Sequence, residues 1–439
     1  MRKFSVIVFI LLANAAVLWE HLPISEVFKA VIFAGLYLCF VFIGLWPRAG
    51  ARLPRRLKIL GGGSALLWMA AVCCAVQIFV HMALWELAAD LSHGIFWLNI
   101  GISLVLIFFT LANAVLRLFW SSGQIGVFYR LLLIFMWWIP VVNIILITRM
   151  WKISEAEFRF GVARYERNLA RQGDKVCKTK YPLLLVHGIF FRDWKIYNYW
   201  GRIPAELLAN GAKIFYGNQE SSASVEDSAE QLKRRILEII EETGCERVNI
   251  IAHSKGGIDA RYAISALGMD AYVASLTTIN TPHRGCLFAR YALEGFPKAL
   301  LFSVSKRYDK LFKKLGDDTP DFFSGASELT DKKCEELNRA LPNCEGVFYR
   351  SVGSTMSSSK SADFPLNISH SIILAIDGEN DGLVTTESMP WGQHTQISPM
   401  GPRGISHGDL IDLTRRDVPG FDVTELYVSL ASELREKGL

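Results

Sequence analysis

Polar residues are scarce in the first third of this 439-residue sequence. Between Phe4 and Thr148 the apolar runs lack the polar face that a helix on the surface of a soluble domain would show. Ionisable residues are almost missing from the interior of these runs, although a transport pathway would need them. The first absence argues against a soluble N-terminal domain, and the second argues against a transporter with a soluble appendage.

The apolar runs are each close to or above the roughly 20 residues that cross a bilayer. They cover Phe4–Leu22, Val27–Trp46, Ile59–Leu87, Ile95–Leu116 and Phe128–Thr148. Tryptophans lie mostly near the ends of the runs, where amphipathic rings favour the headgroup region. We therefore predict a transmembrane helical region over residues 1–150 with about five spans. The basic start and apolar first run also fit a signal peptide, whose removal would leave four spans.

Net charge is modest, at +5, and the basic residues cluster beside the apolar runs. The loop 48–58 is strongly basic, so it is expected on the cytoplasmic side. With five spans, the rest of the chain then lies on the extracytoplasmic side of a bacterial cytoplasmic membrane. Against this, residues 149–171 are also basic, and Pro140 and Asn143 interrupt the last run, which could be re-entrant. These clusters suit anionic membrane lipids as partners better than nucleic acid.

Cysteine is too sparse to define a disulfide framework. Five of the eight cysteines lie in the C-terminal part, and an odd number cannot pair completely. Cys334 and Cys344 could pair in an oxidising compartment, but free thiols fit at least as well.

After the apolar region, helical and strand patterns alternate. Ser154–Arg171 has an amphipathic period behind a capping box, and we assign residues 151–180 to a juxtamembrane linker helix. Strands are expected at Pro182–Val186, Lys213–Tyr216, Arg247–Ala252 and Leu276–Asn280, with helices at Val225–Glu242 and Gly257–Leu267. This alternation predicts an α/β fold over 181–439, a doubly wound and mostly parallel sheet.

The segment Ala252-His-Ser254-Lys-Gly256 stands where a strand ends and a helix begins. Small residues on both sides of the serine are what a nucleophile elbow needs, because its tight turn brings backbones close together. The alternative is a helix N-cap serine, which needs no catalytic partners.

The partners of a nucleophilic serine follow in the expected chain order. A serine hydroxyl needs a base and an orienting acid, and in this kind of fold they come as acid and then histidine. Asp381 follows the apolar run Ile372–Ile376, which we predict to be a strand. His407 lies in a glycine-rich loop before another helix. His283 competes weakly as the base, but it directly follows a central strand.

An acyl-transfer site also needs N–H donors for the oxyanion. His187-Gly188 ends an early strand, and the glycine allows a bend that would aim the Ile189 amide into the site. The Lys255 amide would be the second donor. We expect His187 and Gly188 to line the substrate-binding position, with the His187 side chain also bonding the loop.

The serine segment, Thr281-Pro-His-Arg-Gly285, Asn380-Asp-Gly-Leu-Val384 and His407-Gly-Asp409 together resemble the bacterial triacylglycerol lipases of the Pseudomonas and Burkholderia type, in the α/β-hydrolase superfamily. The similarity runs from about Tyr181 to the C-terminus. It implies Ser254 as nucleophile, Asp381 as acid, His407 as base, and the Ile189 and Lys255 amides as the oxyanion hole.

The resemblance also implies a structural calcium ion, although no cofactor is needed for the chemistry. Asp409 matches one aspartate ligand of the family, and Asp363 is a candidate for the other. Two carboxylates with loop carbonyls would suit calcium; the alternative is a pair of solvated loop aspartates.

The insertion at about 286–343 carries phenylalanines and leucines among many lysines. It is interpreted as a lid that opens to admit acyl chains. Its alternative is two helices packed on the sheet.

The leading hypothesis is a membrane-anchored serine hydrolase that cleaves carboxylic esters of lipids through an acyl-enzyme. A phospholipase or an acyltransferase on the same triad remains open, since fold does not choose between them. A catalytically idle module that binds lipid or a protein partner is the third reading. An idle descendant would be expected to have lost a triad residue or the oxyanion glycine, and none is missing.

Overall fold

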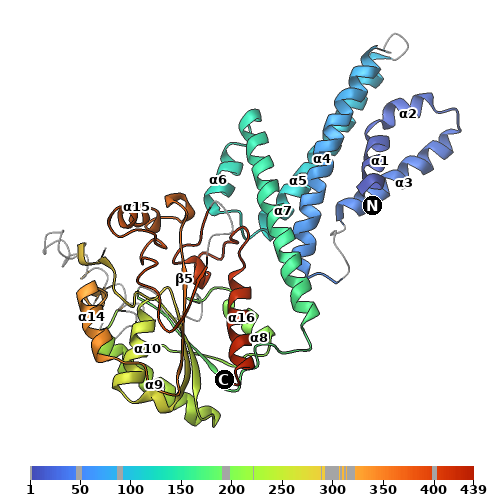
Figure 1. The fold of residues 1–439 in the computed structure, drawn as a ribbon. Coiled ribbons are helices and arrows are strands. Elements are labelled where there is room, and N and C mark those ends of the chain that lie inside the picture. The colour runs from blue at the N-terminus through green and yellow to red at the C-terminus, as the bar shows by residue number, and fades with distance from the viewer. Residues whose placement is uncertain are drawn as a thin grey trace. The chain divides into compact units, whose positions relative to one another are not determined.

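The computed structural model describes residues 2–45, 52–86, 92–189, 198–220, 222–287, 289–291, 306, 309–310, 313, 322–397 and 403–439. The chain divides into two compact units, Met1–Leu169 and Ala170–Leu439. Figure 1 shows both units.

The first unit is helical. Its elements are α1 (Arg2–Ala13), α2 (Ala15–His21), α3 (Glu26–Leu45), α4 (Arg55–Glu86), α5 (His93–Ser121), α6 (Val127–Phe135) and α7 (Pro140–Ala170). The long helices α4 and α5 pack along one another (Figure 1). Among the described residues, α3, α4 and α5 are long and apolar enough to cross a membrane. The pair α1 and α2, bent by 68°, adds a fourth if it counts as one span.

Among the described residues, the last of the five predicted spans does not form one long apolar helix. Phe128–Thr148 is divided between α6 and α7, with the break directly before Pro140. Proline lacks an N–H and fits the first turn of a helix, so it starts α7 instead of continuing α6. Helix α7 then continues past Ser154, where a separate linker helix was predicted to begin. The predicted extracytoplasmic side for the C-terminal region depended on a span in that run.

The second unit is built on a six-stranded sheet in the order β2-β1-β3-β4-β5-β6. Every neighbouring pair of strands is parallel. The strands are β1 (Leu183–Val186), β2 (Ile214–Tyr216), β3 (Val248–His253), β4 (Val273–Ile279), β5 (Phe348–Ser354) and β6 (Gln393–Ile397). This is the predicted α/β architecture, a doubly wound parallel sheet.

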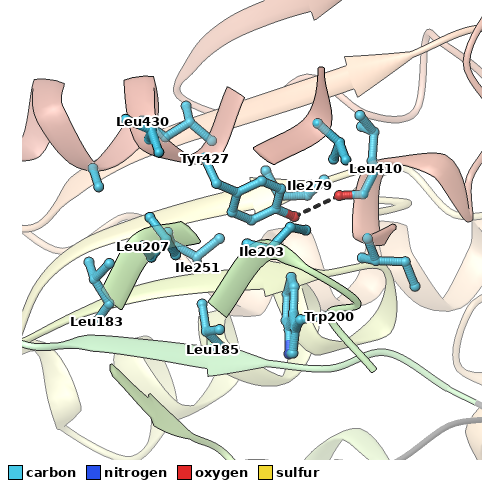
Figure 2. Packing of buried hydrophobic residues seen from close by; sticks show 14 of the residues in the cluster. Leu183, Leu185, Trp200, Ile203, Leu207, Ile251, Ile279, Leu410, Tyr427 and Leu430 are labelled. Atoms are coloured by element: carbon cyan, nitrogen blue, oxygen red, sulfur yellow. Dashed lines mark hydrogen bonds between the residues drawn. The ribbon is translucent and has the colours of Figure 1, made fainter. Parts of the chain in front are cut away.

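Helices cover both faces of the sheet because alternate strand residues point to opposite sides. On one face Leu183 and Leu185 pack against α8 (Ile203–Ala209) and α16 (Val423–Glu436). Figure 2 shows this cluster, in which the Tyr427 hydroxyl donates to the Leu410 carbonyl at 2.9 Å. Leu184 on the other face packs against α9 (Val225–Thr243) and α10 (Lys255–Ala266). Each fully buried leucine contributes about 1.5–3 kcal/mol, so the two clusters fix the strands that carry the site.

The remaining elements lie outside the sheet. They are α13 (Phe322–Ser327), α14 (Asp331–Ala340), α15 (Leu366–Ile376) and the 3-10 turns Met269–Ala271, Ser359–Ser361 and Asp409–Ile411. The strand predicted at Ile372–Ile376 is wrong, because these residues end α15. A short apolar run cannot be assigned to strand or buried helix by its periodicity alone.

Two further expectations concern the insertion and the cysteines. The predicted lid at 286–343 lies partly outside the described residues, which include the segment 322–343 with α13 and α14. All eight cysteines are free thiols, so Cys334 and Cys344 do not pair.

Candidate active site

Ser254 occupies a sharp turn between β3 and α10, with φ 54° and ψ −130°. A side chain at Gly256 would meet the His187 carbonyl oxygen at 2.3 Å, and one at Gly257 would meet Thr281 Oγ1 at 2.2 Å. The predicted elbow therefore has the crowding that demands small residues. Ser254 makes no side-chain cap bond to α10, which removes the N-cap alternative. A non-glycine residue in such a conformation stores about 1–3 kcal/mol of strain, a feature that clusters at active sites.

Asp381 and His407 are brought together from segments 26 residues apart. His407 Nδ1 lies 2.6 Å from Asp381 Oδ2. The other carboxylate oxygen accepts from the amides of Leu383 at 2.9 Å and Val384 at 2.8 Å. Because Asp381 is fully buried and ionised carboxylates only accept, we assign the shared proton to Nδ1. His407 Nε2 is then free to take a proton from a hydroxyl.

Ser254 lies beside the Asp381–His407 pair, because the residue before it, His253, packs against His407. The ring centroids of His253 and His407 are 4.5 Å apart. Within the described residues, Ser254 Oγ and His407 Nε2 are not hydrogen-bonded to each other, whereas the His407–Asp381 bond is formed. Catalytic hydrogen bonds often form fully only when substrate is bound.

The loop after β1 passes close to the serine. A side chain at Gly188 would meet Ser254 Cβ at 2.8 Å, so only glycine fits there. Ile189 follows, 8% exposed, and Lys255 is the first residue of α10, whose N–H has no acceptor within the helix. Both predicted oxyanion donors thus belong to segments beside Ser254.

The His187 side chain bonds the loop, as expected. Its Nε2 lies 2.9 Å from the Gln219 carbonyl oxygen, and the Gln219 amide donates to the His187 carbonyl at 2.8 Å. His187 is 1% exposed, so its ring holds the loop while the backbone after it faces the site.

His283, the competing base, has a different environment. Its Nε2 lies 2.9 Å from Thr278 Oγ1, and its ring stacks on Trp391 at 5.1 Å between centroids. Burial and the nearby guanidinium of Arg261 hold the pKa of His283 well below its usual range. These contacts describe a structural histidine.

The Lys255 side chain takes part in a buried ion pair that sequence reasoning missed. Its Nζ donates to Asp259 Oδ1 at 2.7 Å and to Ser228 Oγ at 3.1 Å. Burial raises the pKa of Asp259 to about 7, although the Lys255 charge acts in the opposite direction. The spacing of four residues on one helix was the available signal.

The two aspartates predicted to bind calcium each contact an arginine. Asp409 accepts from Arg403 at 3.1 Å and from the Ser406 hydroxyl at 2.7 Å. Asp363 pairs with Arg416 at 2.5 Å. Across the described ranges no group of three or more His, Cys, Asp and Glu side chains is placed to hold a metal ion. The arrangement does not fit the calcium site that the resemblance implied, and calcium enters no step below.

Comparison with known proteins bears on this site. Residues 184–308 match a family described as "Putative serine esterase (DUF676)". A triacylglycerol lipase of Pseudarthrobacter phenanthrenivorans is 31% identical over 182 residues, which cover 39% of this chain and 56% of the lipase. A triacylglycerol lipase of Pseudomonas fragi is 27% identical over 306 residues, covering 61% of this chain and all of the lipase. The second unit resembles the triacylglycerol lipases.

This lipase-like unit therefore has the relatives that its motifs predicted. The chain spans about half the length of the first curated lipases that it matches, 56% and 50%. Among solved structures, a lipase of Staphylococcus hyicus is 18% identical, covers 59% of this chain and 96% of its own, and gives a TM-score of 0.47.

Proposed function

We propose that this chain is a serine hydrolase that cleaves carboxylic ester bonds of lipids through an acyl-enzyme. The observation that carries the proposal is the Asp381–His407 hydrogen bond of 2.6 Å beside a serine on a strained elbow. A buried carboxylate that bonds one imidazole nitrogen and a hydroxyl on a sharp turn is an arrangement for nucleophilic catalysis.

The reaction uses the residues as follows. Ser254 Oγ attacks the carbonyl carbon of the ester while His407 Nε2 takes the hydroxyl proton. The Ile189 and Lys255 amides donate to the oxyanion, and Asp381 stabilises the imidazolium. Collapse expels the alcohol, which receives the proton from His407. A water molecule, deprotonated by His407, then attacks the acyl-enzyme and releases the carboxylic acid and free Ser254.

A lipid substrate is supported by an apolar surface next to the acid. Helix α15 has no charged residue, and its apolar side chains are strongly exposed: Phe364, which precedes the helix, 77%, Ile368 54%, Ile372 42%, Leu374 50% and Ile376 44%. The helix is tied to the segment that carries Asp381, because Ser369 Oγ donates to the Gly382 carbonyl at 2.5 Å. An uncharged face in this position suits an acyl chain or a lipid surface better than a polar ester.

Membrane anchoring through the first unit is part of the proposal. Helices α4 and α5 would form a pair of spans, so the basic loop 48–58 and the segment after Ser121 would lie on one side. Residues 149–171 are also basic, and α6 and the start of α7 are too broken to add a span. The positive-inside rule then favours the cytoplasmic side for the lipase-like unit. Eight free thiols agree with a reducing compartment.

A reporter fused after Leu439 tests the side. Activity of a cytoplasmic reporter with silence of a periplasm-only reporter supports the cytoplasmic assignment, and the reverse result restores the extracytoplasmic one.

The function is tested with detergent-purified protein and a series of p-nitrophenyl esters from acetate to palmitate. The wild type is compared with Ser254→Ala and with Ser265→Ala, a control serine later on α10. We expect turnover of long chains by wild type and control only, and no effect of a calcium chelator. Equal inertness of all three proteins would favour an idle binding module, and a preference for short chains would favour a carboxylesterase.

A further inference from the structure

Two buried side chains link the oxyanion loop to the catalytic base, and sequence reasoning singled out neither of them. Tyr199 is 2% exposed and His253 is 1% exposed. The Tyr199 hydroxyl accepts from the Gly188 amide at 3.0 Å and lies 2.7 Å from His253 Nδ1. Gly188 directly precedes Ile189, and His253 directly precedes Ser254, so the link connects both sides of the site.

The bonds of Tyr199 and the burial of His253 together bear on the tautomer of His253. The Tyr199 oxygen accepts from Gly188, and we assign its hydrogen to the bond with His253 Nδ1. Burial lowers the pKa of His253 far below its usual range, the charge of His407 lowers it further, and the His407 backbone opposes these effects in part. His253 is thus neutral, with its proton on Nε2.

The His253 ring also packs against the catalytic base. His253 Nε2 is buried and has no hydrogen-bond partner of normal length within the described residues. The rings of His253 and His407 pack at 4.5 Å between centroids, tilted by 55°. Asp381 holds His407 from its Nδ1 edge, and His253 packs against the ring.

We propose that Tyr199 and His253 act as a positioning pair, which sets the Gly188–Ile189 backbone for the oxyanion and the His407 ring for proton transfer at the same time. The inference rests on the proposed serine hydrolase function. Neither side chain touches the reacting atoms. Loss of the pair should therefore lower turnover more than it weakens substrate binding.

The test uses the full chain with Tyr199→Phe, which removes the hydroxyl and keeps the ring. Tyr349→Phe is the matched control, because the buried Tyr349 hydroxyl also accepts from a backbone amide, that of Cys344 at 3.2 Å. We expect Tyr199→Phe to lower kcat about tenfold or more with KM changed less than about threefold, since a misplaced oxyanion donor costs that much or more. Tyr349→Phe should leave kcat within about twofold of the wild-type value. It should lower the melting temperature about as much as Tyr199→Phe does.

His253 variants test whether the two side chains act as a unit. His253→Leu removes the acceptor, whereas His253→Asn keeps one near the Nδ1 position and should retain more activity. The double variant Tyr199→Phe/His253→Leu should be no slower than His253→Leu alone, because the second change removes a link that is already broken. Additive losses would overturn the proposal, and so would equal kcat losses in Tyr199→Phe and Tyr349→Phe.

A fluorophosphonate probe separates this proposal from the proposed function. It phosphonylates an activated serine with loss of fluoride, whatever the natural substrate. A wild type that is not labelled would overturn the hydrolase function and the positioning pair with it. Labelling of the wild type and of Tyr199→Phe at equal rates would overturn the positioning pair alone.

Discussion

The two units differ in the exposure of their large apolar side chains. In the helical unit large apolar side chains are open to the surroundings, such as Val27 at 74%, Phe79 at 72% and Trp120 at 82% exposure. In the lipase-like unit Leu183 and its strand neighbours are fully buried under helices. Helices α3, α4 and α5 are long and apolar enough to cross a membrane, so the outward apolar side chains of this unit fit the lipid surroundings that we propose for it.

The units also differ in what their buried polar groups do. Glu157 on α7 accepts from the Ser122 hydroxyl at 2.5 Å, from the Gly123 amide at 3.0 Å and from Arg56. These hydrogen bonds satisfy the buried Glu157 carboxylate, and they fix helices to one another. At the end of β3, Ser254 makes no side-chain cap bond to α10, and the nearby His407 bonds Asp381 through Nδ1, which leaves Nε2 for proton transfer. The hydrogen bonds of Glu157 serve helix packing, whereas Ser254 and His407 are placed for the chemistry that we propose.

The strongest test of this contrast is Asp381→Asn. The amide can donate to His407 Nδ1 and impose the wrong tautomer, so kcat should fall by about 10⁴-fold while the fold is kept. Ester turnover and a melting curve measure both effects. The control is Asp363→Asn, which should retain wild-type activity; a loss there equal to that of Asp381→Asn would count against the assigned acid.

In the helical unit the corresponding change is Glu157→Ala. It leaves the Ser122 and Gly123 donors without an acceptor, and we expect a loss of about 2 kcal/mol in the free energy of unfolding. Thermal unfolding in detergent measures it, with the exposed Glu166→Ala on the same helix as control. Turnover of a soluble ester per folded molecule should not change, and a fall in that turnover would contradict the division of roles.

Asp259 tests the contrast through the pH dependence of stability. Its ion pair with Lys255 is buried, and its carboxyl group can still be protonated. Its pKa of about 7 lies above the ordinary 3.8, so the folded state keeps a proton that the unfolded state loses between these values. Asp259 therefore makes stability fall as pH rises from about 4 to 7, by up to about 1.4 kcal/mol per pH unit. Melting temperatures of Asp259→Asn across this range should lack that slope. A slope unchanged from wild type would rule out Asp259 as its source.

Helix α15 of the lipase-like unit has exposed apolar side chains, as the long helices of the helical unit do. Replacing the exposed Ile368 and Ile372 by serine should lower turnover of vesicle-embedded esters about threefold, because half-exposed isoleucines lose part of their burial energy against lipid. Turnover of a soluble short ester should stay the same. Leu208→Ser, on the exposed side of α8 at 56%, is the control. Equal effects on vesicle and soluble substrates would show that α15 has no lipid contact of this kind.

The sequence predicted those features of the site that depend on local sterics and chain order. The elbow was visible because a tight turn permits few residues at Ala252 and Gly256, and the parallel sheet followed from the strand and helix periods. Helix α15 was mistaken for a strand, since its run Ile372–Ile376 is apolar on every side. The interruption at Pro140 is visible in the sequence, which therefore left a re-entrant last run as the alternative to a fifth span.

The contacts that could not be predicted join distant segments. Tyr199 and His253 are 54 residues apart, and no period or spacing relates them. The arginines that meet Asp363 and Asp409 are equally hidden, because an aspartate motif looks the same whether its partner is a calcium ion or a guanidinium.

The left-handed turn at Ser254 has a consequence for how this chain would change over generations. Glycine would adopt φ 54° at this position without the strain that serine stores. A lineage with no use for the hydroxyl would gain stability from that single exchange. Position 254 is therefore where selection for a durable fold and selection for turnover oppose each other most directly.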